Sequence, residues 1–144
     1  MSLVNADTSL LVKRYVRTPA FDAVDDLFDD VDQRFALNEV RLVEMESTLA
    51  RWARDSGAKA STLAQQRVRF ENDHRPGFFE SQAVLAPVQW RARQLIADDK
   101  MPSATLDAIH LATALTIEAD MLATDDRQLA RAAKAQRLNV ISFP

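Results

Sequence analysis

The chain of 144 residues contains no cysteine and only two histidines, His74 and His110. The missing cysteines exclude disulfides and thiolate sites for zinc or iron–sulfur clusters. Two histidines are too few for a metal site built mainly from imidazoles. Any bound metal ion would therefore be held mainly by oxygen atoms, which favours hard cations such as Mg²⁺ or Mn²⁺.

Glycine is also scarce and occurs only at Gly57 and Gly77. This scarcity excludes the glycine-rich loop with which many enzymes cradle nucleotide phosphates. The net charge of −3 excludes a generally basic surface. Nucleic acid could therefore be bound only through a local positive patch.

Long apolar runs are absent as well. The longest, near residues 108–117, is shorter than the roughly 20 residues that a helix needs to cross a bilayer. The N-terminus lacks the basic and apolar regions of a signal peptide. We therefore expect a cytoplasmic protein without membrane contact, folded as one domain over residues 1–144.

Short apolar segments alternate with longer amphipathic segments along the chain. The short segments predict strands at 3–6, 35–37, 78–82, 121–124 and 139–143. The longer segments predict helices at 10–16, 19–34, 40–55, 59–74, 87–98, 105–118 and 127–136, with breaks at Arg75-Pro76-Gly77 and Pro102-Ser103. This alternation is typical of an α/β fold whose helices cover both faces of a parallel sheet, with functional sites beyond the carboxyl ends of the strands.

Three carboxylates fall at unusual places in this pattern. Asp7 and Asp126 follow predicted strands, and Asp107 lies near the start of the most apolar predicted helix. Burying an ionised carboxylate is costly unless a partner compensates for it, and a divalent cation is a common partner where several acids meet. The pattern therefore indicates a magnesium- or manganese-dependent enzyme that acts on phosphate. His110, one turn after Asp107, is interpreted as a core histidine hydrogen-bonded to the backbone.

Local sequence leaves three of these assignments open. Asp7 could cap the following helix, although one carboxylate can both cap a helix and bind a metal. Position alone does not choose between Asp125 and Asp126. On the helix that begins near residue 40, periodicity places Glu46 on the apolar stripe and Glu44 on the opposite side, so the helical wheel favours Glu46 as the buried acid.

Taken together, four segments resemble the PIN-domain nucleases, and especially the toxin ribonucleases of the virulence-associated protein C (VapC) group. Residues 3–13 (LVNADTSLLVK) are similar to the strand–Asp–Thr–Ser–helix opening of the family, and residues 43–51 (VEMESTLAR) to its first acidic helix. Residues 106–114 (LDAIHLATA) are the most specific match, and residues 124–129 (TDDRQL) resemble the Thr-x-Asp element. The departures are small: Asn5-Ala6 replaces a more apolar strand end, and Asn38 stands where a small hydroxyl residue is common.

The resemblance implies a three-layer, Rossmann-like fold and selects four acids as catalytic residues and metal ligands: Asp7, Glu44, Asp107 and Asp126. It chooses Glu44 over Glu46 because only Glu44 puts Asn38 and Leu49 at family-like offsets. The expected reaction is hydrolysis of an RNA phosphodiester that leaves a 5′-phosphate and depends on Mg²⁺ or Mn²⁺. The resemblance also implies a cognate antitoxin whose tail covers the cleft, and a homodimer.

Further residues receive supporting roles on this interpretation. Hydroxyl groups of Thr8, Ser9 and Thr124 are expected to orient carboxylates or water. Candidate RNA phosphate contacts are Arg51, Arg54, Arg127 and Arg131, each of which could equally be solvated helix surface. Trp52 and Trp90 are interpreted as packing residues.

Two other functions are compatible with parts of this pattern. A phosphatase of the haloacid dehalogenase type also begins with a strand and an aspartate, but it needs a second aspartate where Ser9 stands. The other rival is a catalytically silent PIN-like module that binds RNA or protein. The complete set of four acids argues against this module.

Overall fold

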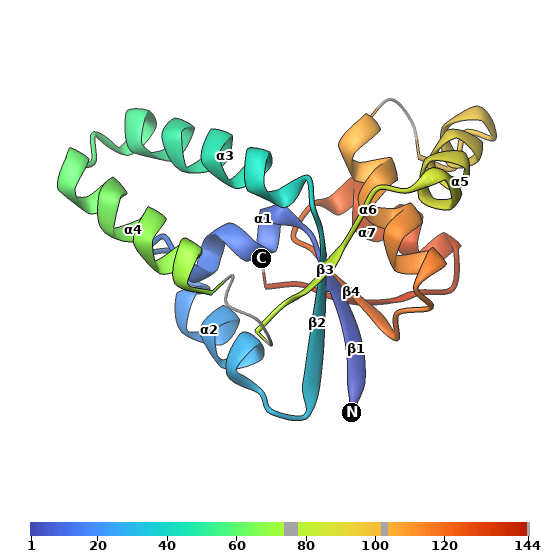
Figure 1. Cartoon of the computed structure of the whole chain (residues 1–144), viewed down its shortest axis with the longest axis horizontal. Helices are drawn as coiled ribbons and strands as arrows, with labels where there is room; N and C mark the ends of the chain where they lie inside the picture. The colour runs from blue at the N-terminus through green and yellow to red at the C-terminus, as the bar shows by residue number, and fades with distance from the viewer. Residues whose placement is uncertain (74–77, 102–103, 144) are drawn as a thin grey trace.

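The centre of the molecule is a sheet in which every pair of neighbouring strands is parallel. The computed structural model describes residues 1–73, 78–101 and 104–143 (Figure 1). Its strands are β1 (Ser2–Ala6), β2 (Gln33–Asn38), β3 (Glu80–Gln82), β4 (Met121–Ala123) and β5 (Asn139–Ile141). Each strand overlaps one of the predicted strands, and the predicted parallel α/β fold is confirmed.

The strands lie in the spatial order β3-β2-β1-β4-β5. After β1 the chain builds the sheet outward on one side and then returns to place β4 on the other side of β1. Such a reversal opens a crevice at the carboxyl ends of the two central strands. Ala6 of β1 pairs with Ala123 of β4, so Asp7 and Thr124 leave the sheet side by side.

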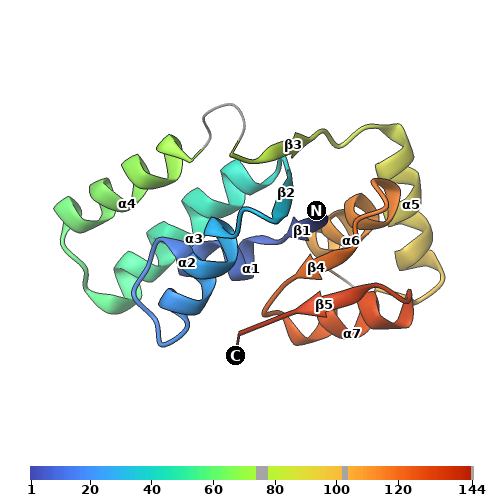
Figure 2. The same ribbon diagram turned by 90° about the horizontal axis from the view of Figure 1, so that it is seen from below.

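Helices cover both faces of this sheet (Figure 2). One layer holds α1 (Thr8–Leu11), the 3-10 turn η1 (Val12–Arg14), α2 (Phe21–Asp29), α3 (Arg41–Ser56) and α4 (Ala60–Asn72). The other layer holds α5 (Ala86–Ala97), α6 (Thr105–Thr116) and α7 (Arg127–Ala135). Each layer has its own apolar core, the first including Leu10, Leu37 and Leu49, the second including Leu111 and Leu129.

Two buried asparagines fasten α6 to the sheet. Asn5 Nδ2 of β1 donates to the backbone oxygen of His110 at 3.3 Å, and Asn38 Nδ2 of β2 donates to Thr113 Oγ1 at 2.8 Å. These are the positions at which the sequence departs from its family resemblance. Because both contacts are buried, they fix where the first turn of α6, and with it Asp107, stands above the sheet.

Several predicted helix boundaries were wrong or fall outside the described residues. The predicted helix 19–34 ends at Asp29, because Asp30 accepts a hydrogen bond from the backbone nitrogen of Asp32 and turns the chain into β2. Val31, which the predicted helix 19–34 includes, is 83% exposed. The predicted helix 10–16 begins earlier, at Thr8, and tightens into η1.

The predicted helix 40–55 corresponds to α3, which ends one residue later, at Ser56, before Gly57, whose φ of 66° is the left-handed conformation that favours glycine. The helix end predicted at His74 and the two breaks at Arg75-Pro76-Gly77 and Pro102-Ser103 lie outside the described residues. Across residues 1–73, 78–101 and 104–143, no helix combines the length and apolarity that crossing a bilayer requires.

A buried arginine joins three elements of the first layer. Arg14 of η1 is 5% exposed and forms ion pairs with Asp25 and Asp29 of α2 and with Asp73 after α4. Tyr15 also donates to Asp73, at 2.6 Å. The Arg14 guanidinium thus offsets the repulsion among three carboxylates, and Arg69 of α4 adds a second ion pair to Asp25.

Replacing Arg14 with alanine should lower the free energy of unfolding by about 2–4 kcal/mol, because it leaves partly buried carboxylates without their cation. Urea unfolding followed by circular dichroism measures the loss. The matched control is Arg34→Ala, which breaks the exposed pair with Glu80 and should leave the midpoint within experimental error. Equal losses in the two variants would contradict a structural role for the Arg14 cluster.

Candidate functional site

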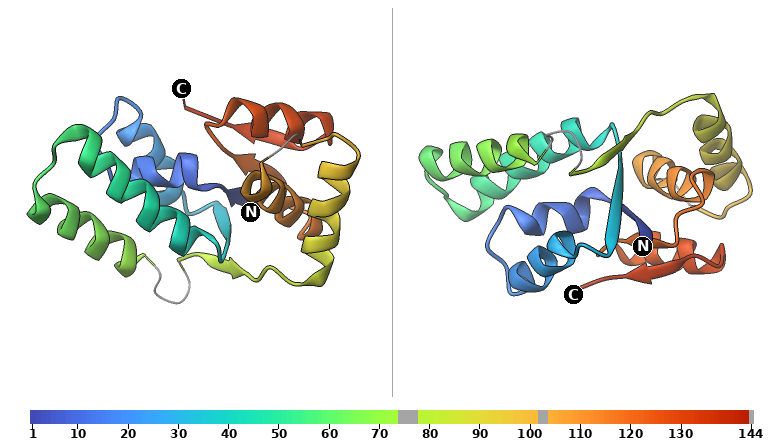
Figure 3. Two further views of the ribbon diagram at one scale, coloured as in Figure 1. Left: turned by 90° about the horizontal axis from the view of Figure 1, so that it is seen from above. Right: turned by 60° about the horizontal axis from the view of Figure 1, so that its bottom comes forward.

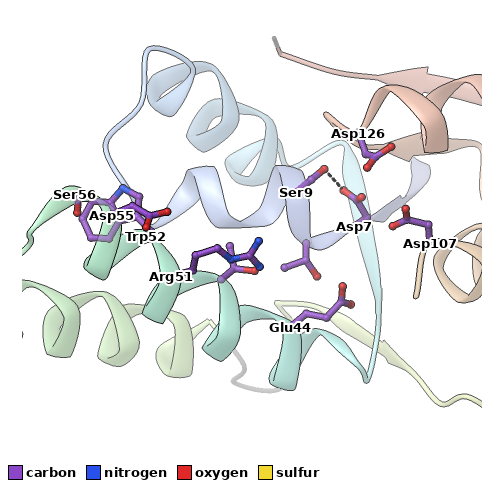
Figure 4. A pocket seen from close by; sticks show the side chains of 11 residues that line it. Asp7, Ser9, Glu44, Arg51, Trp52, Asp55, Ser56, Asp107 and Asp126 are labelled. Carbon is purple, nitrogen blue, oxygen red and sulfur yellow. Dashed lines mark hydrogen bonds between the residues drawn. The ribbon is translucent and has the colours of Figure 1, made fainter. Parts of the chain in front are cut away.

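The four predicted acids line one cavity of about 790 Å³ at the carboxyl edge of the sheet. Asp7 follows β1, Glu44 lies in the first turn of α3, Asp107 lies in the first turn of α6, and Asp126 caps α7. Figure 3 (left) shows the elements at this edge, and Figure 4 shows the four side chains directed toward the same space. The remaining lining residues are Thr8, Ser9, Thr48, Arg51, Trp52, Asp55 and Ser56.

Asp7 is the most deeply buried of the four, with 3% of its surface exposed. Its Oδ1 accepts hydrogen bonds from Ser9 Oγ at 2.8 Å and from the backbone nitrogen of Leu10 at 3.3 Å, so it does cap α1. Thr124 Oγ1 donates to its Oδ2 at 2.9 Å. Burial nevertheless raises the pKa of Asp7 from 3.8 to about 6, because desolvation outweighs the opposing effects of the His110 charge and these hydrogen bonds.

Hydroxyl groups tie the loop after β1 to the loop after β4. Ser9 Oγ accepts from the backbone nitrogen of Asp125 at 3.0 Å, and Thr124 Oγ1 accepts from that of Asp126 at 3.1 Å. Both hydroxyls also donate to Asp7, as the sequence predicted for residues that orient a carboxylate. Thr8 differs: its buried Oγ1 has no hydrogen-bond partner among the described residues, although Thr8 lines the cavity.

The structure separates the two adjacent aspartates after β4. Asp126 lines the cavity and also caps α7 by accepting from the backbone nitrogen of Leu129 at 2.9 Å. Asp125 faces elsewhere: it pairs with Lys13 at 2.5 Å and accepts from the backbone nitrogen of Phe143 at 2.6 Å. Asp125 therefore anchors the segment after β5, and Asp126 is the acid in the cavity.

The two glutamates of α3, Glu44 and Glu46, also have different surroundings. The side chain of Glu44 is 18% exposed and faces the cavity. That of Glu46 is 56% exposed and pairs with Arg67 of α4, outside the cavity. The helical-wheel prediction that Glu46 is the buried acid was wrong, because α3 turns its first-turn residue Glu44 toward the crevice and toward α6.

The buried imidazole of His110 contacts the carboxylate of Glu44. Its Nε2 lies 2.6 Å from Glu44 Oε1, and the imidazole is 1% exposed. Burial alone would lower the pKa of His110, but the hydrogen bond and charge of Glu44, with the charges of Asp7 and Asp107, raise it above 6.5. The expected backbone partner for the ring was wrong, since the imidazole contacts a carboxylate, and its Nδ1 has no partner in the described part of the chain.

Asp107 is half-buried at the start of α6. Desolvation raises its pKa, and the charges of Asp126 and Glu44 raise it further, while His110 opposes them. Asp126 and Glu44 thus destabilise the ionised form of Asp107. A positive charge placed among them would relieve that repulsion.

The acids share the cavity without forming a ready-made metal cluster. Within the described ranges, no three Asp, Glu or His side chains approach closely enough to hold a metal ion together. Glu44 is turned to His110, and both oxygens of Asp7 accept hydrogen bonds. The donor set still suits a hard cation, because it consists of carboxylate oxygens and the unpartnered hydroxyl of Thr8.

One face of α3 extends the cavity beyond the residues that the sequence predicted. Thr48, Arg51, Asp55 and Trp52 follow Glu44 at steps of three or four residues, which places them on one helical face. That spacing was available in the sequence and would have added Thr48 and Asp55 to the predicted site.

The predicted arginine and tryptophan roles divide in the same way. Arg51 lines the cavity with the acids, whereas Arg54 does not. Trp52 packs against the first core, as predicted, and also lines the cavity. Trp90, predicted to pack, is 61% exposed on α5 and lies against Arg93.

Comparison with known proteins gives a family and a fold. The family model for the PIN domain matches residues 5–135. Similar solved structures include VapBC2 from Rickettsia felis bound to a DNA fragment from their promoter (TM-score 0.66, 13% identity, 99% of each chain covered). Another is the sarcin–ricin loop cleaving toxin VapC20 from Mycobacterium tuberculosis (TM-score 0.66, 13% identity, 90% of this chain and 94% of that chain covered). FitAcB from Neisseria gonorrhoeae is also similar (TM-score 0.66, 16% identity, 96% of each chain covered). No curated protein matched the sequence.

The raised pKa of Asp7 predicts a pH-dependent cost of folding. Above pH 6 the folded state must hold a buried carboxylate ion, and this cost disappears as the pH falls from about 6 toward 3.8, where the folded protein takes up a proton. Asp7→Asn should therefore raise the free energy of unfolding by about 1–3 kcal/mol at pH 8 and by little at pH 4.

Urea unfolding in EDTA at the two pH values measures this difference. Asp55→Asn, which alters an exposed acid of the same cavity, is the control and should show no such pH dependence. An equal gain for Asp7→Asn at pH 8 and pH 4 would contradict the burial argument.

Proposed function

This chain belongs to the PIN-domain family, and from that premise we propose that it is a Mg²⁺- or Mn²⁺-dependent endoribonuclease that serves as the toxin of a toxin–antitoxin pair. The observation that carries the proposal is the meeting of Asp7, Glu44, Asp107 and Asp126 in one cavity. Two of them, Asp7 and Asp107, have raised pKa values in the absence of a cation. Such an arrangement costs stability, and a function that needs the charges accounts for it.

We assign the same four acids as the residues that would hold the cation. A divalent cation bound among them would lower the pKa of a bound water and stabilise charge on the phosphate under attack. The buried Thr8 hydroxyl has no partner among the described residues and remains a candidate for orienting a water at this edge of the sheet. No cysteine or lysine is among the described lining residues of the cavity. Ser9 Oγ donates to Asp7 and accepts from the backbone nitrogen of Asp125, and we assign it to orienting the carboxylate rather than to nucleophilic attack.

The protein's own groups prepare the site in distinct ways. Ser9 and Thr124 donate to both oxygens of Asp7 and so fix the plane of its carboxylate. His110 holds a proton at Nε2 against Glu44 Oε1 and keeps that side chain at the edge of the cavity. Asp126 is fixed by its cap on α7, which occupies Oδ1 and leaves Oδ2 for the cavity.

The structural neighbours support the choice of substrate and partner. VapC20 is a toxin that cleaves the sarcin–ricin loop, and VapBC2 and FitAcB are complexes of toxin and antitoxin. We propose by analogy that this chain cleaves RNA, that a cognate antitoxin covers the cleft, and that the protein forms a homodimer. These proposals rest on likeness of fold together with the complete set of acids.

Replacing Glu44 with glutamine or Asp107 with asparagine should lower Mg²⁺-dependent cleavage of RNA by about 100-fold or more, because either change removes a charge that the cation needs. Cleavage of a labelled total-RNA preparation, resolved on gels, measures the loss. Glu46→Gln is the matched control, since Glu46 lies two residues from Glu44 but outside the cavity, and it should cleave at the wild-type rate.

Two results would contradict the assignment of Glu44 and Asp107 as catalytic residues. One is wild-type activity in folded Glu44→Gln and Asp107→Asn proteins. The other is equal loss in Glu46→Gln. Induced expression in a bacterial host then separates a toxin from another nuclease, because only a toxin should arrest growth, and Glu44→Gln should relieve the arrest.

Calorimetric titration with Mn²⁺ provides a test that does not depend on finding the RNA substrate. Wild-type protein should bind Mn²⁺ and should gain thermal stability as the ion is added, because ligands of the folded state stabilise it by mass action. Asp107→Asn should bind at least about tenfold more weakly. Folded wild-type protein that binds no Mn²⁺ would favour the catalytically silent, RNA-binding or protein-binding module instead.

A further inference from the structure

A row of positive charges runs along one face of α7. Arg127, Arg131 and Lys134 are spaced by four and three residues, which places them on the same side of the helix. All three side chains are exposed and line a second cavity of about 470 Å³. We call these three residues the α7 basic face.

The second cavity adjoins the acidic one. Asp126 lines both cavities, and Thr124, which donates to Asp7, lines the second. Because Asp126 is the N-terminal cap of α7, the helix starts at the acids and runs away from them. The α7 basic face therefore continues directly from the proposed cleavage site.

The charges of this face are not neutralised within the described part of the chain. None of its three residues forms an ion pair there, whereas Arg14, Arg34, Arg67 and Arg69 are each paired with an acid. Asp125 also lines the second cavity, but its charge is taken by Lys13. The α7 basic face thus keeps positive charge for an external anion.

On the other side of the acids stands Arg51 of α3. It lines the acidic cavity, and Figure 4 shows its guanidinium directed toward the space in front of Glu44 and Ser9. Within the residues that the structure describes, Arg51 likewise has no ion pair. The cluster of carboxylates is therefore flanked by free cations from two different helices.

We propose that single-stranded RNA crosses the site with its phosphates on the α7 basic face at one end and near Arg51 at the other. The inference rests on the proposed ribonuclease function and adds the course of the strand. Four carboxylates repel a polyanion, so cations on both sides are needed to hold the backbone across them. With a net charge of −3, the chain as a whole does not attract RNA, so local cations have to supply the attraction.

Binding of a fluorescein-labelled, mixed-sequence 12-nucleotide RNA, followed by anisotropy in EDTA across a series of KCl concentrations, tests the proposal. Each phosphate contact on a single strand contributes about 0.7 to the slope of log K against log salt. Arg131→Ala/Lys134→Ala should weaken binding by about tenfold or more and lower this slope by about 1.4. Arg131→Lys/Lys134→Arg, which keeps both charges, should retain the wild-type slope.

The matched control is Arg91→Ala/Lys100→Ala. It removes one arginine and one lysine from a different cavity, which shares no lining residue with either cavity of the site. It should bind RNA as the wild type does. The proposal is overturned if the α7 variant keeps the wild-type affinity and slope, if the control loses as much as the α7 variant, or if the wild-type protein binds no RNA.

Failure of this inference can be distinguished from failure of the proposed function. RNA binding that depends on the α7 basic face, without any cleavage in Mg²⁺, would support the inferred strand path and refute the nuclease. If the protein cleaves RNA in Mg²⁺ but the α7 substitutions do not change its RNA binding, the nuclease function is supported and the inferred strand path is refuted.

Discussion

Burial of the Asp7 carboxylate at the switch point of the sheet is the constraint around which the rest of the site is arranged. The parallel pairing of β1 with β4 brings Asp7 beside Thr124. Ser9, Thr124 and the first turn of α1 then supply donors to both carboxylate oxygens. These bonds do not fully offset the lost hydration, and the pKa of Asp7 stays at about 6. The fold thus retains an uncompensated charge where it builds its cavity.

The charges around Asp7 are distributed differently from the buried charges elsewhere in the molecule. Elsewhere, buried charge is matched within the chain, as in the cluster of Arg14 with three aspartates. In the cavity the acids outnumber their partners, and His110, whose pKa is raised by Glu44, contacts that carboxylate. The unpaired cations are Arg51, which lines the same cavity, and the α7 basic face, which lines the adjoining one. Such a separation suits a site that binds a cation among its acids and a polyanion across them.

Much of the fold could be predicted from local sequence, because β1, β2, β4 and β5 each contain a short apolar run between turn signals. Only β3 (Glu80–Gln82) is polar, and the apolar residues that predicted it, Phe78 and Phe79, precede it. Errors arose where a polar side chain redirected the backbone. Asp30 ends α2 by bonding to the nitrogen of Asp32, yet its neighbours continue a helical pattern. Val31 therefore fell within the predicted helix 19–34, whereas it lies beyond the end of α2 and is exposed. Periodicity reports which residues share a face, but it does not report where the chain leaves that face.

The sequence by itself determined the alternation of strands and helices, the placement of Asp7 and Asp126 after strands, and the restriction of any metal site to oxygen ligands. Only the tertiary structure decided which member of each acidic pair faces the cavity. Glu44 does so because α3 meets α6 at its first turn, where His110 receives it, and Glu46 is drawn to α4 by Arg67. Asp126 does so because Lys13 and the backbone of Phe143 hold Asp125 on the other side. These partners are distant in the chain, so no local pattern encodes the choice.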